Sequence, residues 1–133
     1  MMPRITLLIA SLHVLLFVVL SFRVVLHRRA RGIGVGTGGD EAMTRKMRVH
    51  GNFSEYVPLA LLMLALLELS QLAPAWIWTL GIVLLVARVL HAIGLNGSAG
   101  YSTGRFVGAA TTFALLTVMA LLGIWRFVLP MAL

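Results

Sequence analysis

A cation, an amide and an anion are spaced to share one helix face near the middle of the chain. They are Arg48, Asn52 and Glu55, at positions i, i+4 and i+7 of the segment RVHGNFSEYVP, residues 48–58. Residues at this spacing lie along one stripe of an α-helix. Because the segment leads into a long apolar run, these side chains need polar partners. The partners are one another, other helices or a ligand.

Further charges are expected at the same membrane end. Arg88 stands three residues before His91, and Arg105 opens the last apolar segment. The single carboxylate of Glu55 cannot neutralise these two arginines and Arg48 together. The pattern therefore favours a polar cavity for an anionic or zwitterionic ligand, such as one with carboxylates. The alternative is an internal salt-bridge network that positions helices, with Arg88 paired to Glu55.

The composition is that of a membrane protein. Of 133 residues, 60% are hydrophobic and 11% are charged, whereas soluble domains are about half apolar and about a quarter charged. The length suits a single domain over residues 1–133. The chain has no cysteine, which excludes a disulfide, a thiolate metal site and a cysteine nucleophile. We expect no bound metal.

Four segments are apolar and long enough to cross a hydrocarbon core of about 30 Å. We expect transmembrane helices at residues 5–26, 41–70, 74–95 and 105–128. The first segment is too long for a signal peptide, and no small-residue cleavage site follows it. Short second and third connections favour antiparallel neighbours. The sequence thus predicts an all-α, up-down-up-down bundle.

The first connection, residues 27–44, is rich in glycine. Gly34, Gly36 and Gly39 match the dinucleotide-binding pattern GxGxxG. That pattern requires a preceding strand, whereas a membrane helix is expected here, so a flexible loop is the better interpretation. Asp40 and Glu41 are expected at the start of the second helix, where its dipole favours anions.

The cations are unevenly distributed. The net charge is +7, and seven of the 11 Lys and Arg residues lie in one stretch: Arg23, Arg28, Arg29, Arg31, Arg45, Lys46 and Arg48. The positive-inside rule places this end in the cytoplasm, in contact with phospholipid headgroups, and both termini on the opposite side. Nothing in the pattern indicates a nucleic-acid-binding fold.

Several single residues carry structural expectations. Pro58 is expected to bend the second helix, and Glu68 to reach water at the opposite end. We interpret His13 as a packed histidine rather than a ligand. Small residues of the last helix are expected to permit close helix contact: Gly108, Ala109, Ala110 and Ala114.

The segment 48–58 resembles the signature of the MAPEG family, the membrane-associated proteins of eicosanoid and glutathione metabolism. The matching residues are Arg48, Asn52, Glu55 and Pro58, and Tyr56 is similar to the leukotriene-synthase branch. The resemblance covers nearly the whole chain, because the four-span layout and loop lengths also fit. Small bacterial members are the most similar in character.

Two further stretches resemble this family. ARVLH, residues 87–91, is similar to the third-helix motif of the prostaglandin E synthase branch, and Arg105 resembles the arginine near the glutathione sulfur. The resemblance implies a homotrimer with three glutathione sites between subunits, and its bacterial character suggests an inner membrane. With the cation distribution described above, both termini are then expected in the periplasm. It also implies the residues that hold glutathione: Arg48, Asn52, Glu55, Tyr56, Arg88 and His91.

The implied activity is a glutathione transferase with peroxidase activity. Arg105 would stabilise the glutathione thiolate, which then attacks a lipophilic electrophile arriving from the bilayer. A non-catalytic lipid- or thiol-binding scaffold of the same fold is the alternative. A transporter is disfavoured, since the polar groups gather at one end and form no pathway across the membrane.

Three positions depart from the animal branches. Leu95 stands where several animal relatives place a glutathione-contacting tyrosine, which leans toward the scaffold alternative. Tyr101 is either a substitute for that tyrosine or an interfacial anchor. Gly51 replaces an arginine of the prostaglandin branch, which argues against eicosanoid specificity.

Overall fold

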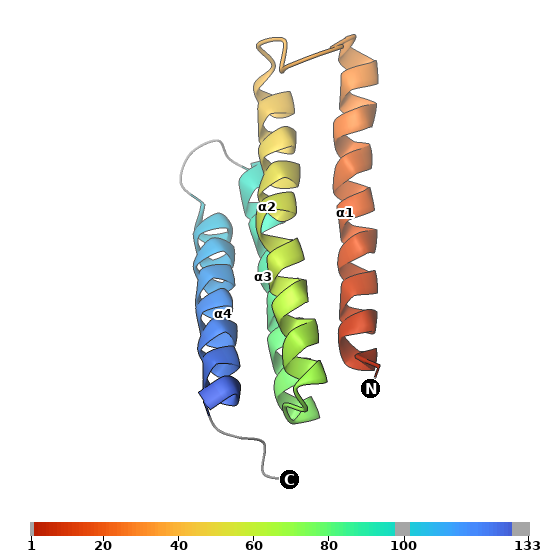
Figure 1. Cartoon of the computed structure of the whole chain (residues 1–133). Coiled ribbons are helices and arrows are strands. Elements are labelled where there is room, and N and C mark those ends of the chain that lie inside the picture. Colours follow the sequence, from red (N-terminus) through yellow and green to blue (C-terminus); the bar gives the residue numbers. More distant parts are fainter. Residues whose placement is uncertain (1, 98–101, 129–133) are drawn as a thin grey trace.

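The computed structural model describes residues 2–97 and 102–128. They form four helices, α1 (Arg4–Arg31), α2 (Glu41–Leu69), α3 (Pro74–Gly97) and α4 (Thr103–Val128), which run alternately up and down (Figure 1). Each helix is long and apolar enough to cross a membrane. The predicted four-span bundle is therefore confirmed. We call the end at residues 32–40 the loop end and the end at residues 70–73 the turn end.

The first connection is shorter than expected, because α1 continues through His27 to Arg31. The helix stops at Gly32, whose φ of 63° is left-handed and whose N–H reaches the carbonyls of Arg28 and Arg29. Basic side chains in the last turn also interact favourably with the helix dipole. The expectation of a loop beginning at residue 27 was wrong for this reason. The loop spans only residues 32–40.

The loop is tied to both neighbouring helices. Asp40 caps α2 by accepting a hydrogen bond from the Met43 N–H at 2.9 Å, and its other oxygen lies 3.0 Å from His27 Nε2. The Lys46 ammonium donates to His27 Nδ1 at 2.8 Å. The Met43 and His27 contacts lower the pKa of the Asp40 carboxyl below its usual value. The expected placement of Asp40 at the helix start is confirmed.

The glycine pattern has no nucleotide-binding context. A helix precedes it, so the strand that the pattern requires is replaced by α1. Gly36 and Gly39 adopt positive φ angles of 68° and 77°, which glycine adopts without steric cost. Arg28 donates to the Gly36 carbonyl at 2.9 Å. The glycines therefore shape a turn that α1 holds in place.

At the turn end, a carboxylate of α2 caps a different helix. Glu68 Oε1 accepts from the Ile5 N–H at 2.9 Å, and Oε2 accepts from the Thr6 N–H at 2.7 Å. Both donors belong to the first turn of α1, where backbone N–H groups lack helical partners and the dipole favours an anion. Glu68 therefore joins α2 to α1, and its side chain stays partly exposed at this end, as expected.

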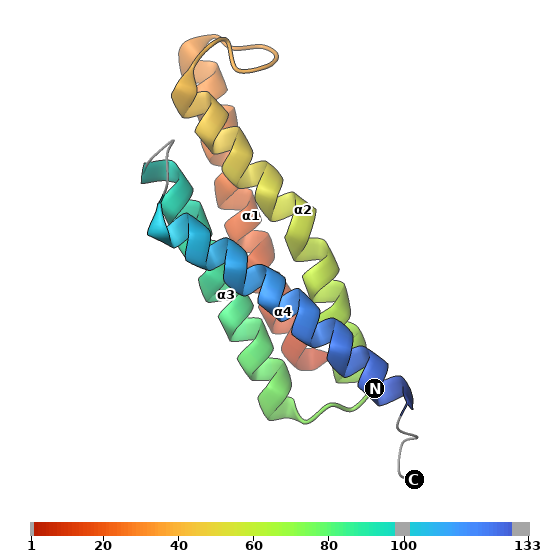
Figure 2. The same ribbon diagram turned by 90° about the vertical axis from the view of Figure 1, so that its left-hand side faces the viewer.

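The main hydrophobic cluster lies toward the turn end and a second one toward the loop end, and α4 crosses α3 in Figure 2. A Cβ at Gly108 would lie 2.5 Å from the Ala87 carbonyl oxygen and 2.7 Å from His91 Cβ. The expected close contact at Gly108 is confirmed, whereas Ala110 and Ala114 are exposed. The main cluster contains Ile9, Ala60, Leu64, Leu67, Leu72, Ile77, Leu80, Leu84, Leu115 and Met119.

His13 and Pro58 each carried a structural expectation from the sequence, one in α1 and one in α2. His13 is 1% exposed, and its Nδ1 bonds to the Ile9 carbonyl at 2.8 Å. Its ring lies 6.1 Å from that of Phe53, so the interpretation as a packed histidine is confirmed. Pro58 lies inside the continuous helix α2, and the bend expected there stays a prediction.

Candidate functional site

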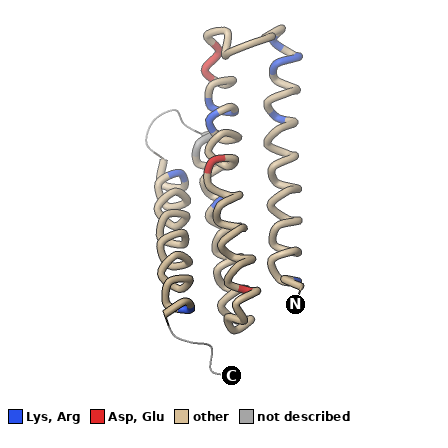
Figure 3. The backbone as a smooth tube through the Cα atoms, viewed as in Figure 1, with Lys and Arg blue, Asp and Glu red and all other residues tan. Residues whose placement is uncertain are grey.

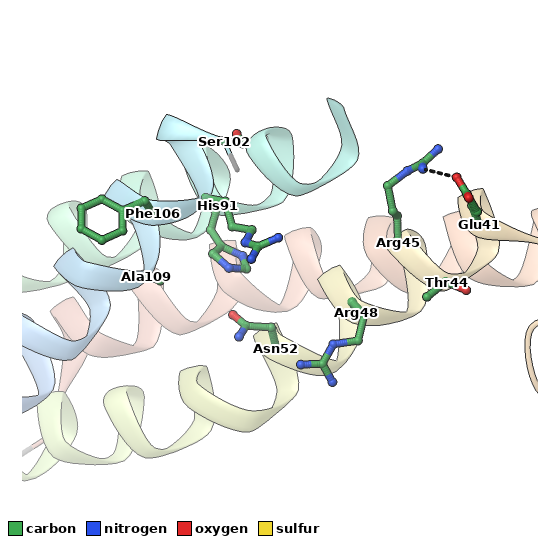
Figure 4. Close-up of a pocket in the computed structure, with 10 residues that line it drawn as sticks. Glu41, Thr44, Arg45, Arg48, Asn52, His91, Ser102, Phe106 and Ala109 are labelled. Atoms are coloured by element: carbon green, nitrogen blue, oxygen red, sulfur yellow. Dashed lines mark ion pairs between the residues drawn. The ribbon is translucent and has the colours of Figure 1, made fainter. Parts of the chain in front are cut away.

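A groove of about 660 Å³ opens at the loop end, between α2, α3 and the start of α4. Lys and Arg residues also gather at this end of α1 and α2 (Figure 3). The residues that line the groove come from α2, α3, α4 and the position just before α4 (Figure 4): Glu41, Thr44, Arg45, Arg48, Asn52, His91, Ser102, Arg105, Phe106 and Ala109. The groove therefore joins segments that are far apart in the sequence.

The α2 wall follows from helical spacing. Glu41, Arg45, Arg48 and Asn52 succeed one another at intervals of four, three and four residues, which places them on one stripe. Glu41 and Arg45 form an ion pair at 3.7 Å. Arg48 is exposed, whereas Asn52 is half-buried and points toward His91 (Figure 4). The outer part of this wall is therefore charged and its inner part carries an amide.

Arg88 lies beneath the groove rather than on its surface. Its side chain is 1% exposed, and one guanidinium nitrogen donates to Asn52 Oδ1 at 2.6 Å. The other terminal nitrogen donates to Thr112 Oγ1 at 3.3 Å. The guanidinium carbon also lies 5.9 Å from the centre of the Phe53 ring. These contacts offset part of the cost of burying a charge in a membrane bundle.

The expected ion pair between Arg88 and Glu55 does not form among the described residues. Asn52 takes the place of Glu55, because Arg88 faces α2 one turn closer to the loop end. Glu55 itself is exposed. Of the two alternatives left open by the sequence, an Arg88–Glu55 network is therefore wrong. A buried polar network nevertheless exists, built on neutral partners.

The structure brings four of the seven predicted site residues to one groove. Arg48, Asn52, His91 and Arg105 line it. Their convergence required only that antiparallel helices place the end of α3 and the start of α4 beside the start of α2. Arg105 thus shares one cavity with residues more than fifty positions earlier in the chain.

The three remaining predicted residues lie elsewhere. Arg88 is behind the groove floor. Glu55 and Tyr56 are deeper along α2 than Asn52 and are not part of the lining. The Tyr56 ring packs edge-on against Phe113 of α4, with ring centres 5.2 Å apart. In the single chain, Tyr56 therefore belongs to the α2–α4 contact.

The sequence reasoning missed several lining residues. Helical spacing does place Arg45 on the face of Arg48 and Asn52, but Arg45 was not named among the candidate site residues. Phe106 and Ala109 depend on the rotation of α4 about its axis, for which the sequence gives no signal. Two other residues were also missed at the groove and its floor: Ser102 and Thr112.

Two candidate positions lie outside the part of the chain that the structure describes. Tyr101 lies outside the described residues, and so does the side chain of Leu95. Gly51 is half-buried in α2, and a Cβ there would lie 4.0 Å from Glu55 Oε1. Within the described ranges, no group of three or more His, Asp or Glu side chains is arranged to hold a metal ion.

The charges on the lining decide what the groove can accept. Three guanidinium groups, those of Arg45, Arg48 and Arg105, face one carboxylate, Glu41. The apolar side chains Phe106 and Ala109 lie on the same lining. An anion, together with an apolar group beside it, therefore suits this groove better than a cation does.

Comparison with known proteins gives the family. The model of the MAPEG family matches residues 6–125. The chain is similar to the inner membrane protein YecN of Escherichia coli strain K12, at 31% identity over 116 residues, 87% of each chain. The YecN protein of Escherichia coli O6:H1 matches with the same identity and coverage.

Proposed function

The chain belongs to the MAPEG family, and on that premise we propose that it is a membrane glutathione transferase that also reduces lipid hydroperoxides. The observation that carries this proposal is the groove at the loop end, where three arginines face one glutamate. Glutathione has two carboxylates and a thiol, so its charge complements the lining. Its partner in the reaction is a lipophilic electrophile dissolved in the bilayer.

The arginines of α2 hold the carboxylates in this proposal. A guanidinium offers two parallel donors that match the two oxygens of a carboxylate. Arg48 is exposed on the groove side of α2 and is the first candidate. Asn52 adds an amide at the inner end, and His91 adds a ring N–H from α3. Arg88 contributes from beneath, by holding Asn52.

Arg105 acts on the sulfur. A nearby guanidinium favours the thiolate over the thiol, which raises the population of the nucleophile at neutral pH. With a chlorinated aromatic substrate, the thiolate forms the carbon–sulfur bond and chloride leaves with the electron pair. The thiol proton passes to solvent. With a lipid hydroperoxide, two glutathione molecules give the disulfide, the alcohol and water.

Glu55 and Tyr56 enter the proposal through assembly. Glu55 is exposed in the single chain and lies on the Arg48 stripe, beyond the inner end of the groove. In a homotrimer with sites between subunits, Glu55 would bind the glutathione ammonium and Tyr56 would line the same site. A ring of three copies joined by one repeated interface satisfies closed symmetry. Large apolar side chains exposed on α1, α3 and α4 are available for lipid and for that interface.

We also propose the location and orientation. The relatives named inner membrane protein support a bacterial inner membrane. The basic loop end would face the cytoplasm, following the positive-inside rule, and both termini the periplasm. This orientation places the groove toward the compartment that contains glutathione. Anionic phospholipid headgroups would contact the cations at the end of α1.

The activity test uses the full chain purified in detergent, with glutathione and a chlorinated nitroaromatic. Conjugation above the uncatalysed rate supports the proposal. Arg105→Ala is expected to lower the rate by about 100-fold, the usual effect of losing a charge-stabilising group. Arg29→Ala is the matched control, because Arg29 is exposed on α1 and outside the groove lining. Equal rates for wild type and Arg105→Ala would contradict the proposal.

The scaffold alternative rests on Leu95, which replaces a tyrosine of the animal branches. It predicts saturable binding of lipid, without turnover of glutathione, by the wild-type chain. Calorimetry with glutathione and with a short-chain phospholipid separates the two functions. Binding of lipid alone would replace the transferase proposal with the scaffold.

A further inference from the structure

The inner end of the groove rests on one buried guanidinium. Arg88 Nη2 lies 2.6 Å from Asn52 Oδ1 and 3.4 Å from His91 Nδ1. Arginine has five N–H donors and no acceptor, and it stays charged in proteins. Both partner atoms must therefore accept. Arg88 thus determines the hydrogen-bonding direction of two groove residues at once.

For Asn52 the consequence concerns the orientation of its amide. The carbonyl oxygen is turned toward Arg88, so the NH₂ group, with two donors, is the part left for the groove. A free asparagine could present either end to a ligand. In this position the amide presents only its donors.

For His91 the consequence concerns the tautomer. A ring nitrogen that accepts from Arg88 carries no proton, so the proton of the neutral ring is on Nε2. A doubly protonated ring would aim an N–H at the guanidinium. Among the described residues, neither His91 Nε2 nor Asn52 Nδ2 is a buried atom without a partner. His91 is 3% exposed and Asn52 is half-buried, and both line the groove, so a ligand would reach these two donors from the groove side.

We propose that Arg88 is a positioning residue that makes Asn52 and His91 donors toward the groove, so that the inner end selects an anionic acceptor group over a ligand ammonium. The inference rests on the proposed function, since the groove is the same site. For glutathione, it assigns a carboxylate or the thiolate to the inner end. The ammonium is excluded from the Asn52 and His91 donors themselves and is left to Glu55, which lies beyond them on α2.

Thr112 provides a control within the same network. Its hydroxyl accepts from Arg88 Nη1 at 3.3 Å and donates to the Gly108 carbonyl at 2.7 Å. It lies on α4 and is not part of the groove lining. Thr112→Val therefore removes one Arg88 contact but leaves Asn52 and His91 held. A purely structural role of Arg88 predicts similar consequences for Thr112→Val and Arg88→Met.

The first test is the tautomer of His91 in the ligand-free protein. Nitrogen NMR of the full chain, labelled at histidine and assigned with His91→Gln, distinguishes a protonated Nε2 from a protonated Nδ1. We expect a single Nε2–H form in wild type and in Thr112→Val, and a mixture in Arg88→Met. A wild-type Nδ1–H form would overturn the inference. The wild-type result needs His91→Gln for the assignment alone and does not need glutathione binding, so it is independent of the proposed function.

The second test is selectivity, measured by calorimetry with three probes. Glutathione has the thiol and both carboxylates. S-methylglutathione lacks the free thiol, and glutathione diethyl ester lacks both carboxylates. Wild type is expected to bind glutathione more tightly than one of the two modified probes. That probe is the diethyl ester if a carboxylate occupies the inner end, and S-methylglutathione if the thiolate does. Arg88→Met is expected to reduce that preference by about tenfold, the effect of one lost hydrogen bond, and Thr112→Val to preserve it. An unchanged preference in Arg88→Met would overturn the inference.

Discussion

The two ends of the bundle contain the same kinds of charged side chain and use them differently. At the turn end, Glu68 accepts two backbone N–H groups of α1, and Arg126 of α4 donates to the Ser70 carbonyl that ends α2. Glu68 and Arg126 are each matched to a helix terminus of opposite partial charge. These two residues join helices, whereas Arg4, at the start of α1, is exposed.

At the loop end, some charges bind the helices and the loop, and others gather on the lining of one groove. The carboxylate of Asp40 is bound to the α2 backbone and His27, and Arg28 is bound to a loop carbonyl. On the groove lining, three arginines stand against one carboxylate, that of Glu41. The comparison of the two ends indicates that charges of one sign gathered on a single cavity lining, rather than placed singly at helix termini, point to a site.

The largest predicted effect lies at the loop end. Arg105→Ala is expected to lower the conjugation rate by about 100-fold while the thermal unfolding midpoint stays near that of wild type. Arg126→Ala, at the turn end, should do the reverse, because Arg126 joins α4 to α2. Conjugation assays and thermal unfolding of both variants measure this difference. Loss of activity in both, with equal loss of stability, would remove the distinction between the ends.

The next effect concerns the contact that places α4 beside the groove. In Gly108→Ala the new Cβ would lie 2.5 Å from the Ala87 carbonyl oxygen, so α3 and α4 must separate. A cost of about 2 kcal/mol is expected in the free energy of unfolding. Gly123→Ala, toward the turn end, meets only the flexible tip of Met63 at 3.4 Å and serves as the control. Denaturant unfolding that shows equal stability for both variants would contradict the packing account.

A smaller effect is expected at the α1 start. Glu68→Ala removes the carboxylate that caps Ile5 and Thr6, at a cost of about 1 kcal/mol. Glutathione affinity should be unchanged, because the site is at the other end. Glu41→Gln serves as the control for stability, because the Glu41 side chain is 85% exposed. It does not serve as a control for affinity, because Glu41 lines the groove. A change in glutathione affinity in Glu68→Ala would show that the ends are coupled.

The smallest effect is on the loop and depends on pH. The pKa of Asp40 is lowered by the Met43 N–H and by His27. The carboxylate contacts therefore stabilise the fold above the unfolded-state pKa of Asp40, about 3.9, and this stabilisation is lost as pH falls through the lowered folded-state value. Asp40→Asn keeps a capping side chain and should flatten this acid dependence. Hydrogen exchange of the Met43 amide in acid, compared between the two proteins, measures it.

Much of the architecture could be predicted from the sequence, because lipid imposes long apolar helices with satisfied backbones. The loop boundary at residue 27 could not, since α1 extends beyond its apolar run until Gly32 ends it. Charge alone did not reveal the partner of Glu68 either. That contact depends on how α1 and α2 are aligned along their lengths, which hydropathy does not specify.

The site was predicted in part for a similar reason. Spacing along α2 placed Arg48 and Asn52 on one stripe, and antiparallel packing brought His91 and Arg105 to them. Spacing could not show that Arg88 points beneath the groove rather than into it. That distinction depends on the rotation of α3 about its axis and on Thr112 of α4. The Thr112 hydroxyl accepts a hydrogen bond from the second terminal nitrogen of Arg88.

The measurement that tests the central claim most directly is calorimetric titration of glutathione into the full chain in detergent. It compares wild type with variants of Arg48, which lines the groove, and of Arg29, which does not. Wild type and Arg29→Ala are expected to bind with equal affinity. Arg48→Ala should bind at least about tenfold more weakly, the effect of one lost charge-assisted hydrogen bond. No binding to wild type, or equal affinity for Arg48→Ala and wild type, would contradict a glutathione site in this groove.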